Sequence, residues 1–122
     1  MSDKNIGILN PGEELQAGQK LFSPSGEYFL VMQTDGNLVV YAVGASTDSE
    51  NANRPIWASH TNGKGGTVAK MQGDGNFVVY TAGGAPVWAS NTNGHGNSFV
   101  RMQDDGNMVI YQAIWASNSK QH

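Results

Sequence analysis

The chain has 122 residues, which is the size of one ordinary domain, and only 14% of them are charged. Seven basic against ten acidic residues give a net charge of −3, which disfavours nucleic acids and anionic membranes as partners, and the absence of cysteine excludes disulfides and thiolate metal sites. We therefore expect residues 1–122 to form a single domain. Sixteen glycines, with frequent Asn and Ser, predict short strands and tight turns rather than helices.

The N-terminal residues Met1–Asn5 are polar and lead into no apolar signal region. No run of about 18 apolar residues follows, so no transmembrane helix and no membrane insertion are expected. The sequence favours a cytoplasmic protein and leaves secretion by a non-classical route open.

Three copies of one segment organise the chain. Each runs from Met-Gln through Asp-x-Asn to Tyr, at Met32–Tyr41, Met71–Tyr80 and Met102–Tyr111. A segment with the pattern Ile/Val-Trp-Ala-Ser follows each copy, at Ile56–Ser59, Val87–Ser90 and Ile114–Ser117. β-Branched runs on both sides of an Asp-Gly or similar turn predict a hairpin in every copy. The chain is therefore predicted to be all-β, with three antiparallel sheets of about four strands related by a pseudo-threefold axis.

The copies differ in their loops. In the first copy the polar, acidic segment Gly44–Asn53 separates the Tyr from the Trp, and we expect a surface loop there. In the third copy only two residues separate Tyr111 from Ile114. The third Trp strand is thus close to the C-terminus, where a strand that does not turn back can pair with another chain, which indicates strand exchange in a dimer. A frayed tail is the alternative that the sequence leaves open.

Within each copy, chemically distinctive side chains recur at every second position; in the first copy these are Gln33, Asp35, Asn37, Val39 and Tyr41. Alternate residues of an extended chain share a face, so these side chains can converge on one patch. A hairpin keeps Gln33 on that face only if its loop has an odd number of residues, for which Asp35–Asn37 is the candidate.

Each patch offers one carboxylate, two carboxamides, one phenol and one small apolar residue. These polar groups can donate to and accept from sugar hydroxyls, while the valine would touch the apolar face of a ring. The combination suits a neutral polyol better than a phosphate, a metal or a base. Asp-Gly-Asn is also ordinary turn chemistry and Val and Tyr are ordinary strand residues, but a turn does not require the Gln that all three copies contain.

The triple motif Gln-x-Asp-x-Asn-x-Val-x-Tyr, interleaved with Ile-Trp-Ala-Ser, resembles the monocot mannose-binding lectins of the snowdrop-bulb type, from about Ile8 to Ser119. The resemblance implies a bulb-type lectin domain with a β-prism II fold of three four-stranded antiparallel sheets and one mannose site per sheet. It also implies roles: Asp and Asn bind the 2-hydroxyl of mannose, Gln the 3-hydroxyl and Tyr the 4-hydroxyl, while Val packs on the ring carbons. The implied mannose-binding residues are Gln33, Asp35, Asn37, Val39 and Tyr41 (first patch), Gln72, Asp74, Asn76, Val78 and Tyr80 (second patch), and Gln103, Asp105, Asn107, Val109 and Tyr111 (third patch).

The resemblance further implies association through the C-terminal strand, in agreement with a homodimer. Plant members of the family usually carry a secretory signal and a disulfide that joins the turn of the first motif to the start of the next repeat. This chain has Gly36 in that turn and no cysteine around Thr67 and Val68. The chain therefore resembles the cysteine-free relatives found outside secreted plant lectins. Its Gly44–Asn53 insertion is also longer than the link usual in the family.

Other conspicuous residues are assigned structural roles. One Trp per repeat beside Ile or Val is typical of a pseudo-threefold core, and the resemblance implies that Trp57, Trp88 and Trp115 face the centre of the prism. The three histidines, His60, His95 and His122, share no metal-ligand spacing, and Asp104–Asn107 lacks the ligand pattern of a calcium loop. We expect no metal and no cofactor.

The sequence thus predicts a non-enzymatic lectin for mannose and mannose-rich glycans, whose weak sites act together through multivalency. Three alternatives remain at this stage. One is a lectin-like bacteriocin, toxin or defence protein of the same fold, and another is an interaction scaffold with unused sugar sites. The third is a glycoside hydrolase, which needs two carboxylates about 5–9.5 Å apart, whereas each patch contains one Asp.

Overall fold

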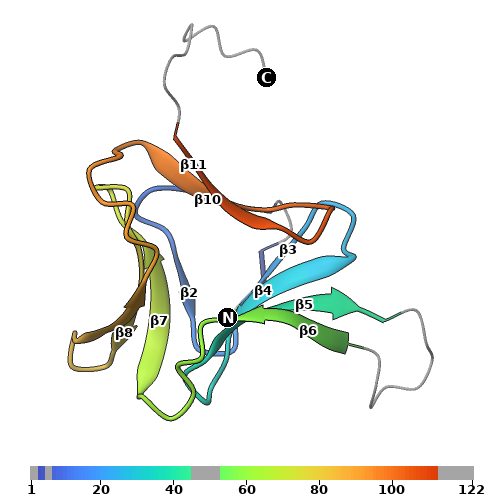
Figure 1. Cartoon of the computed structure of the whole chain (residues 1–122), viewed down its shortest axis with the longest axis horizontal. Helices are drawn as coiled ribbons and strands as arrows, with labels where there is room; N and C mark the ends of the chain where they lie inside the picture. The colour runs from blue at the N-terminus through green and yellow to red at the C-terminus, as the bar shows by residue number, and fades with distance from the viewer. Residues whose placement is uncertain (1–2, 5–6, 45–52, 113–122) are drawn as a thin grey trace, which may run out of the picture.

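The computed structural model describes residues 3–4, 7–44 and 53–112, and its regular elements within these ranges are all β-strands. Figure 1 shows the strands along the three sides of a triangle, as a β-prism requires. In chain order they are β1 (Ile8–Leu9), β2 (Glu14–Gln16), β3 (Lys20–Phe22), β4 (Tyr28–Met32), β5 (Leu38–Val43), β6 (Asn53–Ala58), β7 (Gly66–Met71), β8 (Phe77–Thr81), β9 (Pro86–Ala89), β10 (Ser98–Met102) and β11 (Met108–Gln112).

Three antiparallel sheets form from these strands, with the orders β3-β4-β5-β6, β2-β7-β8-β9 and β1-β10-β11. The first two contain the four strands that the sequence predicts. The third has three strands within the described residues, because the predicted fourth, Ile114–Ser117, lies outside them. Of the expected loop at 44–53, residues 45–52 also lie outside the description, whereas Asn53 already begins β6.

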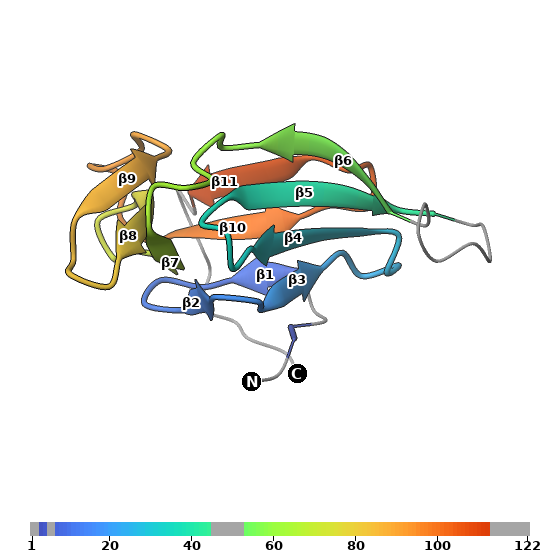
Figure 2. The same cartoon turned by 90° about the horizontal axis from the view of Figure 1, so that it is seen from below.

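The N-terminal strands link the three sheets. β1, β2 and β3 follow one another in the chain, yet each pairs with a different sheet, and Figure 2 shows them together along one edge of the molecule. Each contributes one fully buried leucine to the core: Leu9, Leu15 and Leu21. The segment from Ile8 to Phe22 therefore closes one end of the prism and holds the three motif hairpins together.

The core lies between the sheets and follows the two-residue period of the strands. In β4 and β5 the inward residues are Leu30, Met32, Leu38 and Val40, and the matching positions of the other hairpins are Ala69, Met71, Phe77, Val79, Val100 and Met102. The residues between them point outward, because successive side chains of a strand alternate between the two faces of its sheet. Each outer face thus presents one set of motif residues.

The tryptophans follow the predicted core placement only in part. Trp88 is half-buried and packs edge-on against Phe77, with ring centroids 6.1 Å apart. Trp57 stands opposite the core residue Val40 and packs edge-on against Trp88 at 5.6 Å, so it lies on the inner face as predicted. Its burial is incomplete, however, because 38% of its surface is exposed. The physical reason is a hollow of about 340 Å³ between Trp57 and the turn at Gly106. Trp115 lies outside the described residues.

The motif hairpins have the odd loop that the face argument requires. Met32 pairs with Leu38, and the Gln33 N–H donates to the Asn37 carbonyl at 2.9 Å, which leaves a loop of Thr34–Gly36. The predicted loop of Asp35–Asn37 was thus displaced by one residue, because Asn37 already accepts a bond from across the hairpin. The odd length nevertheless places Gln33 on the same face as Val39 and Tyr41, as predicted.

Close packing of the motif turns explains the glycine in each. Gly75 has a φ of +95°, and a Cβ added there would lie 2.2 Å from the carbonyl oxygen of His95. Both the conformation and the space admit only glycine at this position. The turn of the second copy is therefore pressed against the loop that leads into the third sheet.

Candidate functional site

The first patch is an ordered chain of hydrogen bonds. Tyr41 Oη donates to Gln33 Oε1 at 2.5 Å, and Gln33 Nε2 donates to both carboxylate oxygens of Asp35 at 3.1 Å. The backbone N–H of Asn37 also donates to Asp35 Oδ1, at 2.9 Å. The three polar side chains are thus positioned by one another and by the turn, because the hairpin brings residues eight positions apart onto one face.

The asparagine of the first motif is held in place by two residues that lie outside the motif. Asn37 Oδ1 accepts hydrogen bonds from Ser59 Oγ at 3.1 Å and from the Thr61 N–H at 3.2 Å. Thr61 is buried, and its Oγ1 donates to the Gly36 carbonyl at 2.7 Å. Within the described residues no hydrogen bond involves Asn37 Nδ2, so the amide can donate both protons to a ligand. Sequence reasoning missed Ser59 and Thr61, although the repeat of Trp-Ala-Ser-x-Thr was the available signal.

The second patch repeats this arrangement with one difference. Asn76 Oδ1 accepts from Ser90 Oγ at 3.3 Å and from the Thr92 N–H at 3.2 Å, and Asp74 Oδ1 accepts from the Asn76 N–H at 3.0 Å. Here the carboxamide of Gln72 turns its Nε2 toward Tyr80 Oη. The tyrosine, glutamine and turn residues therefore meet on one face in this copy as well.

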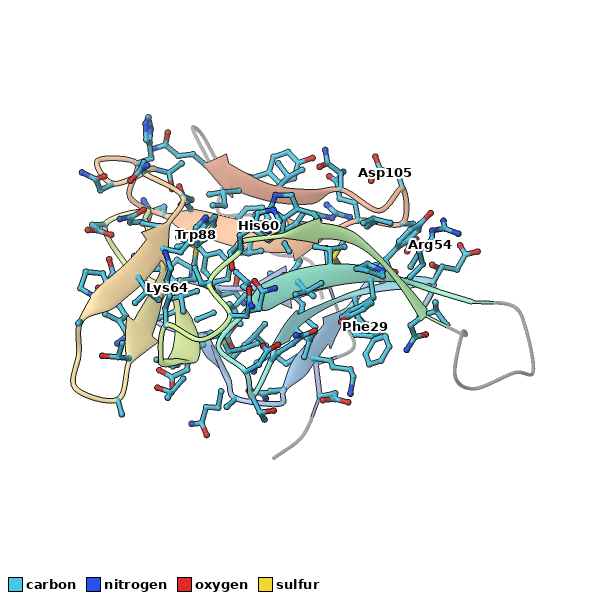
Figure 3. The ribbon with its side chains drawn as sticks, turned by 60° about the horizontal axis from the view of Figure 1, so that its bottom comes forward. Phe29, Arg54, His60, Lys64, Trp88 and Asp105 are labelled. Atoms are coloured by element: carbon cyan, nitrogen blue, oxygen red, sulfur yellow. The ribbon has the colours of Figure 1, made fainter. Side chains whose placement is uncertain are left out.

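In the third patch Tyr111 Oη donates to Gln103 Oε1, and Gln103 Nε2 donates to Asp105 at 3.2 and 3.4 Å. Figure 3 shows Asp105 at the turn between β10 and β11. The Asn107 N–H, and then the Gln103 carboxamide, lower the pKa of Asp105 below its ordinary value. The carboxylate is consequently a charged acceptor at neutral pH. The Ser and Thr partners that the first two patches have would correspond here to residues outside the described ranges.

The motif valines lie beneath the polar side chains. Val39 exposes 2% and Val78 3% of its surface, whereas Val109 is half-buried. On the outer face of the first sheet, Val39 belongs to a small apolar cluster with Phe29 and Val31. The first two valines thus support the patch and leave little apolar surface for a ligand. Their contact with a sugar ring remains a prediction.

Neighbouring side chains make the three patches different. Opposite the motif valine stand Val31, Lys70 and Arg101 in the first, second and third copies. Opposite the motif tyrosine stand Phe29, Val68 and Phe99, and the phenylalanine rings stack on their tyrosines at 5.2 and 5.8 Å. At these two positions the polar network therefore has only apolar neighbours in the first patch, and one cationic and one apolar neighbour in the second and third.

The first patch opens into a groove of about 710 Å³ that continues along β6. Its walls are Asn37, Val39, Tyr41, Pro55, Ile56, Trp57, Ala58 and His60. His60 adopts a left-handed backbone with a φ of +60°, as Asn91 does at the matching position of the second copy. The exposed imidazole of His60 consequently borders a surface of about the size of a sugar. The sequence alone did not predict that His60 would lie beside the first patch.

Neither a metal centre nor a membrane helix emerges from the described residues. Within 3–4, 7–44 and 53–112, no three His, Asp or Glu side chains gather closely enough to hold an ion. Nor does this part of the chain include a helix capable of spanning a bilayer. What the patches offer is hydrogen bonding: one charged acceptor, two amides and a phenol, fixed on the outside of a rigid sheet.

Known proteins resemble this chain along most of its length, although no protein-family profile matches it. A mannose-specific lectin of Narcissus pseudonarcissus is 42% identical over 75 residues, which cover 61% of this chain and 59% of that lectin. The chain spans about half the length of the curated relatives that it matches, 37%, 59% and 46% for three of them.

Solved structures match more completely. The snowdrop (Galanthus nivalis) mannose-specific agglutinin, complexed with methyl-α-D-mannoside, is 38% identical with a TM-score of 0.78, and the match covers 96% of this chain and 100% of that one. The monomeric monocot mannose-binding lectins from Gastrodia elata are 41% identical with a TM-score of 0.72, over 95% and 100% of the two chains. With its β-prism II fold, the chain belongs to the family of monocot mannose-binding lectins of the snowdrop-bulb type.

Proposed function

We propose that the protein is a non-enzymatic lectin that binds mannose and mannose-containing glycans at its three patches. The observation that carries this proposal is the chain of hydrogen bonds from tyrosine through glutamine to aspartate, found in the first and third patches with the asparagine beside it. Relatives named for mannose specificity add support.

Each patch matches the hydrogen-bonding needs of vicinal hydroxyls. The Asp35 carboxylate accepts a hydroxyl proton, Asn37 Nδ2 donates to a hydroxyl oxygen, and Tyr41 Oη accepts through the lone pairs that its bond to Gln33 leaves free. In line with the family resemblance, the 2-hydroxyl is assigned to Asp and Asn, the 3-hydroxyl to Gln and the 4-hydroxyl to Tyr. Because these side chains are already held in place, binding costs little side-chain entropy.

Affinity for a single sugar is expected to be low. The patches are exposed surfaces of a sheet, so a Kd on the order of 1 mM, or about 4 kcal/mol, is anticipated for one mannose. Useful affinity then requires that several patches bind one branched glycan, since linked sites raise the effective concentration.

The protein is further proposed to form a homodimer in which Ile114–Ser117 pairs with β11 of a second copy. Support comes from the edge of β11, which among the described residues pairs only with β10, whereas β5 and β8 each pair on both sides. A hollow of about 340 Å³ lies beside this edge and is lined by Val40, Ile56, Trp57, Gly106, Asn107 and Met108. Covering the exposed side chains of Ile56 and Trp57 with another apolar strand would remove their apolar surface from water and so favour association.

Retention on immobilised mannose tests the lectin proposal. The protein should bind the column and elute with methyl mannoside but not with galactose. The combined variant Asp35→Asn, Asp74→Asn and Asp105→Asn keeps the shape of each turn and should pass through unretained. Retention of this variant at the wild-type level would contradict the assignment of the patches, and a folded wild-type protein that fails to bind mannose would contradict the function.

A further inference from the structure

The third patch borders a hollow on the surface of the protein. It has a volume of about 310 Å³ and is lined by Pro24, Arg101, Gln103, Asp104 and Asp105. Gln103 and Asp105 belong to the third patch itself, so the hollow and the proposed mannose site share two side chains. A ligand that occupies the patch can therefore extend into the hollow without leaving the protein surface.

Arg101 supplies the donor group of this hollow. It stands on β10 directly opposite Val109, and on its other side it is paired with Ile8 of β1. Among the described residues its guanidinium has no hydrogen-bond partner and no carboxylate within 4.0 Å. Its five N–H donors are thus available to an incoming ligand, and a planar guanidinium can donate to two adjacent hydroxyl oxygens at once.

Asp104, which also lines the hollow, supplies an acceptor. The Ser25 N–H donates to its Oδ1 at 2.9 Å, which ties the loop at Ser23–Gly26 to the motif turn and fixes the carboxylate. This bond, followed by the Ser25 side chain, lowers the pKa of Asp104, so the group is ionised at neutral pH. A carboxylate has several lone pairs, so this group can also accept a hydroxyl proton from a ligand.

The same positions in the other copies lack this combination. Arg101 is replaced by buried Val31 in the first copy and by Lys70 in the second, while Asp104 is replaced by Thr34 and Gly73. The charge of the hollow also restricts its ligand. Two carboxylates outweigh one guanidinium, so a neutral, hydroxyl-rich molecule is favoured over an anionic one.

We infer that the hollow at Arg101 and Asp104 is a second hexose subsite, which makes the third patch a site for two linked sugars of a neutral mannose glycan. The inference rests on the proposed function, because it needs mannose in the neighbouring patch. One hexose ring held in the patch would place its linked neighbour between the guanidinium and the carboxylate. The third patch would then prefer a disaccharide, whereas the first and second would bind the same disaccharide about as weakly as mannose.

Variants with one intact patch isolate this effect. Asp35→Asn with Asp74→Asn leaves the third patch, and Asp35→Asn with Asp105→Asn leaves the second. Calorimetric titration with methyl mannoside and with the α1,2-, α1,3- and α1,6-linked mannobioses gives a disaccharide preference for each. We expect the third-patch protein to bind at least one mannobiose about tenfold tighter than methyl mannoside, as one added set of hydrogen bonds allows. Arg101→Val in this background should abolish that preference while methyl mannoside binding is retained.

Lys70→Val in the second-patch protein is the matched control, since it removes a cation from the same strand position, and it should leave the binding ratio unchanged. Equal affinity of the third-patch protein for methyl mannoside and all three mannobioses would overturn the subsite, as would a preference that survives Arg101→Val. Neither result would touch the lectin proposal, which fails only if methyl mannoside itself does not bind. Retained methyl mannoside binding also shows that the Arg101 variant is folded.

Discussion

Thr61 donates a 2.7 Å hydrogen bond from its Oγ1 to the carbonyl of Gly36, across 25 residues of chain. The same threonine offers its N–H to Asn37, so the segment after the first Trp strand holds both the turn and the asparagine of the first patch. Thr92 repeats the bond to Gly75 in the second copy. The stability of the turn and the proposed binding function of the first patch therefore depend on the same contact.

Thr61→Val should destabilise the protein and weaken the first patch. The substitution keeps the shape but leaves the Gly36 carbonyl without its side-chain donor, at a cost of about 1–2 kcal/mol. Chemical denaturation measures the loss, and the mannose affinity of a protein with only the first patch intact should fall with it. Thr92→Val removes the equivalent bond in the second copy and should lower the free energy of unfolding by a similar amount. A variant as stable as the wild type would show that the bond does not hold the turn.

Gly75→Ala should be far more damaging than Gly84→Ala. Both glycines have positive φ, +95° and +88°, but a Cβ at Gly75 would meet the His95 carbonyl at 2.2 Å, whereas nothing lies within 4 Å at Gly84. Left-handed strain alone costs about 1–2 kcal/mol, so Gly84→Ala sets the baseline. The additional clash should make Gly75→Ala clearly less stable in thermal unfolding. An equal loss of stability in the two variants would mean that the turn can shift away from the added Cβ at no energetic cost.

His60→Gly should stabilise the protein. His60 has a φ of +60°, a conformation in which glycine avoids the clash of a Cβ, so a gain of about 1 kcal/mol is expected. Asn91→Gly, at the matching position, is the comparison and should gain less, because asparagine tolerates this conformation better than most residues. Differential scanning calorimetry checks the order of the three melting temperatures. Lower stability of His60→Gly would reveal a favourable contact of the imidazole.

Acid should abolish mannose binding at the third patch only below the ordinary pKa of Asp105, which is 3.8. Hydrogen bonds from Asn107 and Gln103 lower its pKa in the folded state, so the ionised carboxylate stabilises the folded protein above the ordinary value. That contribution is lost as the pH falls through the folded-state pKa. Titration of the third-patch protein with methyl mannoside from pH 7 to 3 should therefore show constant affinity down to about pH 4. A loss at pH 5–6 would point to another group.

Truncation after Ala113 should convert a dimer into a monomer. In the proposed assembly the deleted segment covers Ile56 and Trp57 of the partner copy, so its removal leaves their apolar surface exposed. Sedimentation velocity of the full chain and the truncated chain provides the comparison. A full chain that sediments as a monomer, the state of the monomeric lectins from Gastrodia elata, would contradict the exchange. So would a truncated chain that remains a stable dimer.

The convergence of the motif side chains on one face was predictable because its determinants are local. The two-residue period of Gln33 to Tyr41 indicates one shared face, and the same pattern in three copies indicates three sheets. The need for an odd loop also follows from alternation alone. The position of that loop could not be predicted in the same way. It depends on the hydrogen bond from the Gln33 N–H to the Asn37 carbonyl, which makes Asn37 part of the strand pairing.

Only the tertiary structure decided which distant segments meet. Nothing local assigns β1, β2 and β3 to three different sheets, brings Thr61 beneath the first turn, or leaves Trp57 exposed. Likewise, the sequence alone does not show that Arg101 and Asp104 line one hollow together with Pro24, which lies far away in the sequence. The physical reason is that alternation is a property of each strand by itself, whereas these contacts depend on how separate strands pack around a common core.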